Sequence, residues 1–472
     1  MEAYYKPGFK KNATIVGHEN YITAVEKKQV KVILCLHHFL PDFVGGTEIY
    51  TLNIAKYLIE KNIDVLVLIP NLGIEKTEEY GYEGVRIIKY AENSIEDRDM
   101  ILGKKKPSGL KEFSEIIQKE NPDIVHFHEL APGKGISIFH VEKIHELKIK
   151  VIITLHVSFY SCFKGTLLYK NKEQCDGKII LERCTSCIYH EKNIKGLKAS
   201  LLKNTAMALY KLHINATSVN GSMGTALGFP YVIDKIRIDL LRLSFLAEKI
   251  IVIADWYKNI LERNGVPQEK LIYIKQGLPN EIQNKPLPRM IDLPLKVVFI
   301  GRINKLKGLH LLTEAVSKID STKINLDIYG PGDESGYGSI LKEKIKDYKN
   351  ICWNGRIASA DVIETLAKYH VMCLPSAFEM SPLVIQEAFA AGIPVLASDV
   401  YGNAEQVRNG ENGWLFKFND VENLKDKLEM LINNTSLITG AMKILPGLNS
   451  FREAGSQHLK LYEAVAEKYS YA

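Results

Sequence analysis

The sequence has no long hydrophobic run and no large excess of charge of either sign. Lys and Arg number 61 and Asp and Glu number 55, which gives a net charge of +6. This balance is too mild for a dedicated nucleic-acid-binding protein. The longest uncharged run, Leu212–Ile233, contains Asn, Ser, Gly and Pro residues that a hydrocarbon core would tolerate poorly. We therefore expect neither a membrane-spanning helix nor a nucleic-acid partner.

The first 20 residues also lack the apolar core of a secretory signal peptide. Apolar residues make up 46% of the chain and charged residues 25%, values typical of a soluble globular protein. Wholesale disorder and collagen-like structure are therefore excluded. We expect a cytoplasmic protein. A basic segment, described below, also allows peripheral contact with the inner face of the membrane.

Short β-branched runs alternate with longer amphipathic stretches, in two series. In the first series the expected strands are residues 30–37, 64–70, 123–128 and 150–156, and helical patterns cover 48–62 and 109–121. In the second series the expected strands are residues 295–302, 324–330, 350–355, 371–376 and 394–398. Strands separated by helices predict parallel sheets with right-handed crossovers, whose ligands bind beyond the carboxyl ends of the strands.

The predicted fold class is therefore α/β, with two Rossmann-like domains. We place the first domain at residues 30–290, with an insertion at about 158–245, and the second at residues 291–446. Residues 1–29 form an N-terminal extension. Residues 447–472 are expected to hold a helix that crosses back to the first domain.

The most informative stretch is SAFEMSPLVIQEAFAAGIPVLAS, residues 376–398. Ser381 is a good N-cap and Pro382 a good first helical residue, while Gly392 ends the helix. Glu379 precedes this helix and Glu387 lies within it. The helix N-terminus between them offers free N–H groups and the positive end of a dipole, which suits a phosphate. From spacing alone, two surface glutamates on a capped helix explain the pattern equally well.

This stretch resembles the E-x7-E motif of retaining GT-B glycosyltransferases of glycosyltransferase family 4, also called glycosyl transferases group 1. FIGRINKLKG (299–308) is similar to that family's G-R-x4-K-G signature, and HHFLPDFVGGTEIY (37–50) is similar to its Gly-rich loop. IADWYKNILERNGVPQEKLIYIKQG (253–277) and GENGWLF (410–416) resemble later family segments. The resemblance covers about residues 30–472 and implies a GT-B fold, in which two Rossmann-like domains face each other across a cleft.

The resemblance implies a set of catalytic and donor-binding residues. The implied catalytic residues are His156, Glu379, Arg302 and Lys307. The implied donor-binding residues are Gly45, Gly46, Gly301, Met380, Ser381, Pro382, Leu383 and Glu387. A forked Arg and a Lys can neutralise a pyrophosphate leaving group, so no divalent metal is expected for the chemistry.

Three histidines end strands at the expected ligand-binding edge. His156 matches the family histidine near the donor sugar, although the family often has Asp after it and this sequence has Val157. Two interpretations of His126 and His128 are open. Either one of these histidines lines the cleft, or both are structural.

The implied activity is retaining transfer of a sugar, of the hexosyltransferase type, from a nucleotide-sugar to an acceptor hydroxyl. The expected setting is bacterial cell-surface polysaccharide or glycoconjugate synthesis, with a carbohydrate or a lipid-linked carbohydrate as the acceptor. A nucleotide-sugar epimerase on the same fold and an inactive nucleotide-sugar-binding subunit are the alternatives. The intact Glu379, Glu387, Arg302 and Lys307 argue against the inactive subunit.

Four of the seven cysteines form a cluster in the sequence, namely Cys162, Cys175, Cys184 and Cys187. A structural zinc ion held by four thiolates is one reading, and unliganded thiols are another. Disulfides are disfavoured in a cytosolic chain.

Residues 193–250 hold eight Lys or Arg against three acidic residues. This excess suits anionic lipid headgroups or a lipid-linked acceptor at a peripheral membrane contact. An ordinary solvated helical face explains it equally well.

Overall fold

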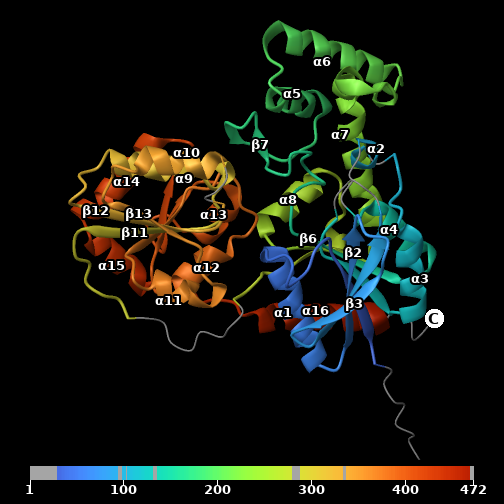
Figure 1. Ribbon diagram of the computed structural model, residues 1–472, viewed down its shortest axis with the longest axis horizontal. Coiled ribbons are helices and arrows are strands. Elements are labelled where there is room, and N and C mark those ends of the chain that lie inside the picture. The colour runs from blue at the N-terminus through green and yellow to red at the C-terminus, as the bar shows by residue number, and fades with distance from the viewer. Residues whose placement is uncertain are drawn as a thin grey trace, which may run out of the picture.

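The computed structural model contains two open, mostly parallel β-sheets (Figure 1). It describes residues 29–93, 98–102, 104–130, 135–278, 287–332 and 336–467. Most of the predicted N-terminal extension, and the end of the 447–472 segment, lie outside these residues.

The first sheet has eight strands in the order β10-β9-β6-β5-β1-β2-β4-β3. Its strands are β1 (Lys31–Cys35), β2 (Asp64–Leu72), β3 (Glu78–Tyr82), β4 (Val85–Glu92), β5 (Ile124–Phe127), β6 (Lys150–Leu155), β9 (Lys249–Val252) and β10 (Leu271–Tyr273). All neighbours are parallel except β3 and β4, which form an antiparallel hairpin. The sequence pattern did not indicate this hairpin, because β3 is largely exposed and has no buried apolar run.

The second sheet has six strands, all parallel, in the order β13-β12-β11-β14-β15-β16. Its strands are β11 (Leu295–Ile300), β12 (Ile324–Tyr329), β13 (Ile351–Gly355), β14 (Val371–Leu374), β15 (Val395–Ser398) and β16 (Gly413–Phe416). The central strands of both sheets are almost fully buried, as expected where helices cover both faces. The predicted fold class is confirmed.

Helices cover both sheets (Figure 1). The helices of the first half are α1 (Gly46–Glu60), α2 (Arg98–Ile101), α3 (Leu110–Glu120), α4 (Ile138–Glu146) and α8 (Asp255–Arg263). Those of the second half are α9 (Leu309–Ser317), α10 (Gly336–Ile345), α11 (Val362–Leu366), α12 (Leu383–Ala390), α13 (Tyr401–Gln406), α14 (Val421–Asn433) and α15 (Ser436–Lys443).

The predicted start of the motif helix is wrong by one residue. We expected Ser381 as the N-cap and Pro382 as the first helical residue, but α12 begins at Leu383. Pro382 is the N-cap, with an extended backbone at φ −69° and ψ 115°. A proline has no N–H to lose, so it suits either side of this boundary.

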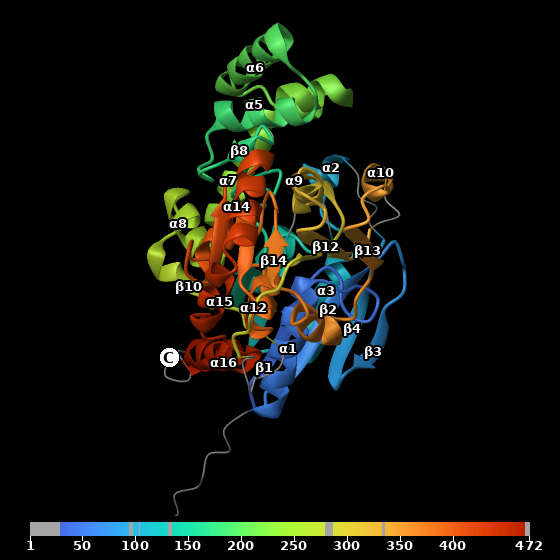
Figure 2. The ribbon, with the colours of Figure 1, turned by 90° about the vertical axis from the view of Figure 1, so that its left-hand side faces the viewer.

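An insertion of helices and a short hairpin follows β6 and projects away from both sheets (Figure 2). It contains β7 (Leu168–Tyr169), β8 (Glu173–Gln174), α5 (Leu181–Glu191), α6 (Gly196–Lys211) and α7 (Gly221–Leu246). Its sequence does not alternate strands and helices, which explains why it interrupts the α/β rhythm. Within the described ranges, no helix is both long enough and apolar enough to cross a membrane.

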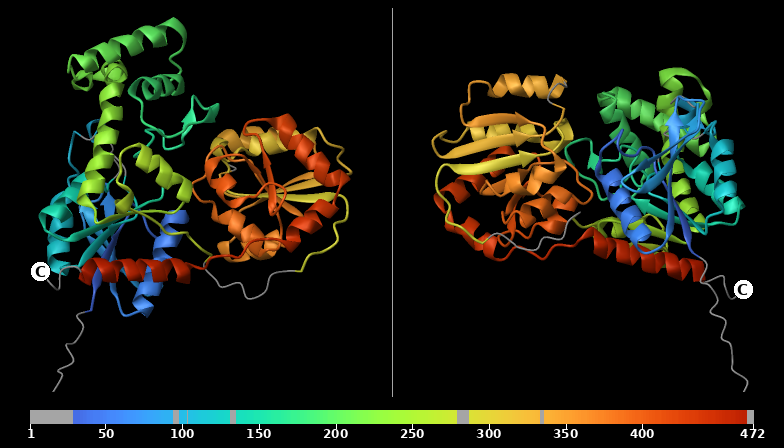
Figure 3. Two further views of the ribbon diagram at one scale, coloured as in Figure 1. Left: turned by 180° about the vertical axis from the view of Figure 1, so that it is seen from behind. Right: turned by 60° about the horizontal axis from the view of Figure 1, so that its bottom comes forward.

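The last helix, α16 (Phe451–Glu467), returns from the second half and packs along α1 of the first (Figure 3). Arg452 pairs with Glu60 at 2.9 Å. The contact is tightest at Gly455, where an added Cβ atom would lie 2.5 Å from the ring of Tyr57. Because Gly455 has no side chain, it leaves room for the Tyr57 ring between the two helices.

This contact predicts that Gly455→Ala lowers the melting temperature. Overpacking of this kind costs about 1–3 kcal/mol. The matched control is Gly440→Ala in α15, where an added Cβ atom would meet nothing within 4 Å. Since alanine is a better helix former than glycine, the control should be stabilised by roughly 0.5–1 kcal/mol. Equal shifts of the two melting curves would contradict the described packing of α16 on α1.

Candidate active site

The candidate site lies where loops at the carboxyl ends of strands from both sheets come together. From the first sheet, β1 leads to the loop that ends at Gly45, and β6 ends beside His156. From the second sheet, β11 leads to Gly301 and to the basic loop 301–308, and β14 leads to the loop 375–382 in front of α12. This is the edge at which ligands of open parallel sheets bind.

Lys307 and Glu379, from two different loops of the second half, form an ion pair. Lys307 Nζ lies 2.5 Å from Glu379 Oε1, and both side chains are largely buried. The two loops touch because Gly308 adopts a left-handed conformation (φ +67°) with its Cα against the carbonyl oxygen of Pro375. A Cβ atom there would lie 1.9 Å from that oxygen. The second glycine of the G-R-x4-K-G signature, Gly308, is therefore required sterically, because any side chain would clash with the backbone of Pro375.

Arg302 is exposed and lies close enough to Glu48 of α1 for their charges to interact. Burial raises the pKa of Glu48, and the nearby Arg302 partly opposes that rise. A Cβ atom at Gly45 would lie 2.5 Å from Glu48 Oε2, so Gly45 leaves room for this carboxylate. Glu48 was not among the predicted site residues. Its position as the third residue of a helix that follows a Gly-rich loop could have indicated it from the sequence.

Glu387 lies in the middle of α12 and is partly buried. Within the described part of the chain its carboxylate has no hydrogen-bond or ion-pair partner. Burial raises the pKa of this group from 4.5 to about 7. A buried acid without a protein partner is suited to bind ligand hydroxyl groups, which would donate hydrogen bonds to it.

His156 is buried where β6 ends, with its Nε2 atom 3.4 Å from Nδ1 of His128. Burial, together with the nearby His458 of α16, lowers the pKa of His156 to about 3. The imidazole is therefore neutral near pH 7. It can donate or accept a hydrogen bond but carries no charge.

His126 and His128 are fully buried. His126 is hydrogen-bonded on both sides, to the Tyr462 hydroxyl at 2.5 Å and to Thr154 Oγ1 at 2.8 Å. This arrangement fits the structural reading for His126. His128 Nε2 is buried and has no hydrogen-bond partner among the residues that the structure describes.

The remaining predicted donor-binding residues lie around these groups. Gly46 is the first residue of α1, and Gly301 directly follows β11. Met380 is 8% exposed, and Ser381, Pro382 and Leu383 lead into the N-terminus of α12. The predicted donor-binding residues thus lie on the loops at this edge or on the helices that follow them, with Glu387 in the middle of α12. Their roles in binding stay predictions.

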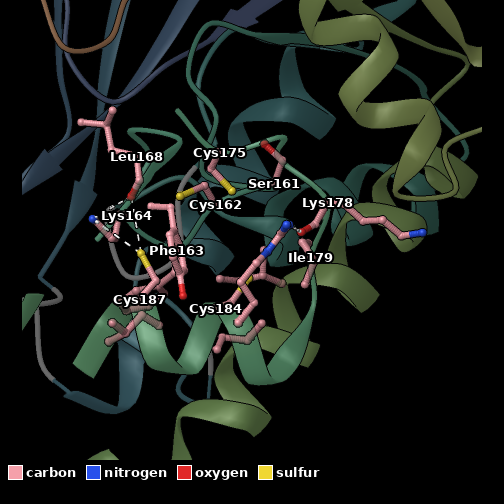
Figure 4. A pocket seen from close by; sticks show the side chains of 15 residues that line it. Ser161, Cys162, Phe163, Lys164, Leu168, Cys175, Lys178, Ile179, Cys184 and Cys187 are labelled. Atoms are coloured by element: carbon pink, nitrogen blue, oxygen red, sulfur yellow. Dashed lines mark hydrogen bonds between the residues drawn. The ribbon is translucent and has the colours of Figure 1, made fainter. Parts of the chain in front are cut away.

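The four clustered cysteines line a separate pocket in the insertion (Figure 4). All are free thiols. Cys187 has partners of its own, because its sulfur accepts a hydrogen bond from Lys170 N at 3.2 Å and lies 3.4 Å from Leu168 O. In the residues that the structure describes, no group of three or more His, Cys, Asp or Glu side chains is arranged to hold a metal ion. The structural zinc stays a prediction.

Comparisons with known proteins agree with the geometry of this site. The family described as Glycosyltransferase Family 4 matches residues 44–188, and that described as Glycosyl transferases group 1 matches residues 290–441. The chain belongs to the GT-B glycosyltransferases. The two matches cover the Gly-rich loop of the first half and both signature loops of the second half of this glycosyltransferase.

Relatives and solved structures are consistent with this assignment. The capsular polysaccharide biosynthesis glycosyltransferase CapM of Staphylococcus aureus is 26% identical over 344 residues, 68% of this chain and 84% of that protein. A 41.2 kDa protein of the cps region of Klebsiella pneumoniae is 24% identical over 65% of this chain and 68% of its own length.

Among solved structures, sucrose-phosphate synthase of Thermosynechococcus elongatus superposes with a TM-score of 0.59 at 16% identity, covering 94% of this chain and 98% of that one. Anabaena Alr3699/HepE in complex with UDP-glucose superposes with a TM-score of 0.54 at 14% identity, covering 94% and 100%. At these identities the likeness shows the fold.

The raised pKa of Glu387 predicts a pH-dependent stability. The folded protein keeps this proton up to about pH 7, whereas an unfolded glutamate releases it near pH 4.5. The group therefore destabilises the folded state increasingly from pH 4.5 to 7, and fully above pH 7. Glu387→Gln should raise stability at pH 8 by on the order of 2–3 kcal/mol and leave it unchanged at pH 4.5.

Thermal melts of wild type and variant at the two pH values measure this difference. The control is Glu364→Gln, because the Glu364 side chain is 81% exposed and its removal should change stability little at either pH. A Glu387→Gln shift that is the same at pH 4.5 and pH 8 would contradict the raised pKa.

Proposed function

We propose that this glycosyltransferase moves a sugar from a nucleotide-sugar to an acceptor hydroxyl with retention of anomeric configuration. The proposed setting is the synthesis of a bacterial cell-surface polysaccharide or glycoconjugate. The observation that carries the proposal is the convergence of Lys307, Arg302 and the N-terminus of α12 at one edge of the second sheet. Two cations and a helix N-terminus suit a diphosphate. The relatives in capsular polysaccharide synthesis and the neighbour that binds UDP-glucose support this choice.

In the proposed reaction the bond between the sugar carbon and the diphosphate breaks, and the acceptor oxygen bonds to that carbon on the same face. The acceptor proton passes to the leaving phosphate. Arg302 and Lys307 stabilise the negative charge that grows on the diphosphate. Glu387 accepts hydrogen bonds from nucleotide hydroxyls, and Glu379 orients the sugar while paired with Lys307. Neutral His156 offers a hydrogen bond to the sugar.

The neutral state of His156 has a consequence for this proposal. An uncharged imidazole does not attract the diphosphate electrostatically, so the binding of that group depends on the second half. This division of roles places phosphate recognition in the loop 301–308 and in α12, and sugar contact at the end of β6.

The leaving-group role predicts that Arg302→Ala and Lys307→Ala each reduce turnover at saturating donor concentration by on the order of 10²–10³. Arg302→Lys should not restore full activity, because an ammonium cannot reproduce the bidentate fork. The matched control is Lys305→Ala, an exposed lysine in the same turn as Lys307, which should keep near wild-type turnover.

The turnover number with radiolabelled nucleotide-sugar measures this effect. Near wild-type turnover in both alanine variants would remove the leaving-group role. Sugar rearrangement in donor alone, without transfer to an acceptor, would favour the epimerase instead.

We also propose that the acceptor is lipid-linked and that the enzyme contacts the membrane through residues 193–250. Within that range, the charged side chains of α7 form ion pairs: Lys235 with Asp239, Arg237 with Asp234, and Arg242 with Glu142 of α4. Lys195, Lys198, Lys203 and Lys211, which have no ion-pair partner among the described residues, lie on and around α6.

On α6, Ala206 is the buried residue. Leu197 and Leu201 are 91% and 72% exposed, and Lys198 and Lys203 lie on the same helix. The helix lies at the far end of the insertion, away from both sheets (Figures 1 and 2). Exposed leucines among lysines suit the surface of an anionic bilayer.

This proposal predicts that wild-type protein co-sediments with phosphatidylglycerol-containing vesicles at low salt. Leu197→Ser with Leu201→Ser should weaken binding by on the order of 10²–10³, because each change removes about three apolar carbons at up to about 0.8 kcal/mol per buried CH₂. The control is Ile340→Ser on α10, a residue that is 62% exposed near Lys342 and Lys344. Equal loss in both variants, or no wild-type binding, would refute contact through α6.

A further inference from the structure

Three successive carbonyl oxygens of the loop that carries Glu379 are held by side chains. Trp256 Nε1 donates to Met380 O at 2.9 Å, Gln276 Nε2 donates to Ser381 O, and Gln406 Nε2 donates to Pro382 O at 3.2 Å. Gln406 belongs to the second half, as does the loop. Trp256 and Gln276 belong to the first half, so two of the three bonds cross the interface between the halves.

Trp256 is fixed from several sides. Its ring stacks on Tyr401 of α13, with ring centroids 4.5 Å apart and an interplanar angle of 11°. Its backbone N–H donates to Glu405 Oε2 at 2.9 Å, and Asp255 N–H donates to Glu405 Oε1 at 3.3 Å. An acid from α13 thereby caps the N-terminus of α8, where a negative charge is favourable. These contacts exist only when the two halves are together.

α13 itself is packed directly against the loop. A Cβ atom at Gly402 would lie 2.4 Å from Glu379 O and 2.7 Å from Met380 O. A displacement of α13 therefore displaces the backbone of the loop. The Tyr401 hydroxyl also donates to Cys175 O of the insertion at 2.9 Å, so the insertion is attached to the same contact.

We infer that Trp256 and Gln276 are positioning residues, through which closure of the two halves sets the backbone of residues 379–382 and the N-terminus of α12 for the nucleotide-sugar. The inference rests on the proposed function, because that loop is where the donor is proposed to bind. In an open arrangement, Met380 O and Ser381 O lose their partners from the first half. The loop can then take other conformations. The donor binds less tightly because the loop conformation that binds it is less populated.

The test measures the dissociation constants of UDP, ADP and GDP by calorimetry for the full chain. Trp256→Phe keeps an aromatic ring against Tyr401 but removes the N–H donor, and Gln276→Ala removes the other donor. Each variant should weaken binding of whichever diphosphate the wild type binds by about 2- to 12-fold, the range expected for one neutral hydrogen bond. The double variant should also have a larger radius of gyration in small-angle scattering with the nucleotide present.

Trp353→Phe is the matched control, because Trp353 lies on β13 and its buried Nε1 has no hydrogen-bond partner within the described ranges. It should leave the dissociation constant unchanged, and Trp256→Phe should lower the melting temperature of the nucleotide-free protein no more than this control does. Wild-type affinity in both Trp256→Phe and Gln276→Ala would overturn the positioning role while leaving the proposed function intact. Failure of the wild type to bind any of the three nucleotides would instead overturn the proposed function, and the inference with it.

Discussion

The ion pair between Lys307 and Glu379 is the interaction on which the candidate site depends. It joins the basic loop after β11 to the loop in front of α12, and both side chains are largely buried. Removing one partner of such a pair leaves an uncompensated charge, which is costly. The pair forms only because Gly308 lets the two backbones touch at Pro375. The steric requirement at one glycine therefore fixes the position of a cation at the proposed phosphate site.

The two halves of the enzyme contribute different chemistry to the interface. The second half supplies charge, through Arg302, Lys307 and the N-terminus of α12. The first half supplies a neutral, buried histidine at position 156 and side chains that hold the backbone of the opposing loop. Helix α16 follows the second half in the chain and packs on α1 of the first half, so it is a second connection between the two halves. Closure of the two halves is thus linked to the conformation of the loop 379–382.

Much of this arrangement was predictable from local sequence. Buried β-branched runs predicted β1, β2, β5 and β6 of the first sheet and β11 to β15 of the second, but not the other strands. The signature loops follow from their resemblance to the family motifs. The antiparallel β3 was not predictable in this way, because its apolar residues, Tyr80 and Tyr82, are few and only partly buried. Nor were the stacking of Trp256 on Tyr401 and the proximity of Glu48 to Arg302, since each joins residues that are more than 100 positions apart. The contacts of Cys187 with Lys170 N and Leu168 O likewise depend on how the hairpin β7–β8 packs on α5.

The proposed function requires the diphosphate of the donor to bind between Arg302, Lys307 and the N-terminus of α12. The most direct test is a crystal structure of the full chain soaked with the nucleoside diphosphate that binds it. We expect phosphate oxygens within hydrogen-bond distance of both cations and of the first N–H groups of α12, and ribose hydroxyls donating to Glu387. A nucleotide bound elsewhere, with Lys307 still paired only to Glu379, would contradict it.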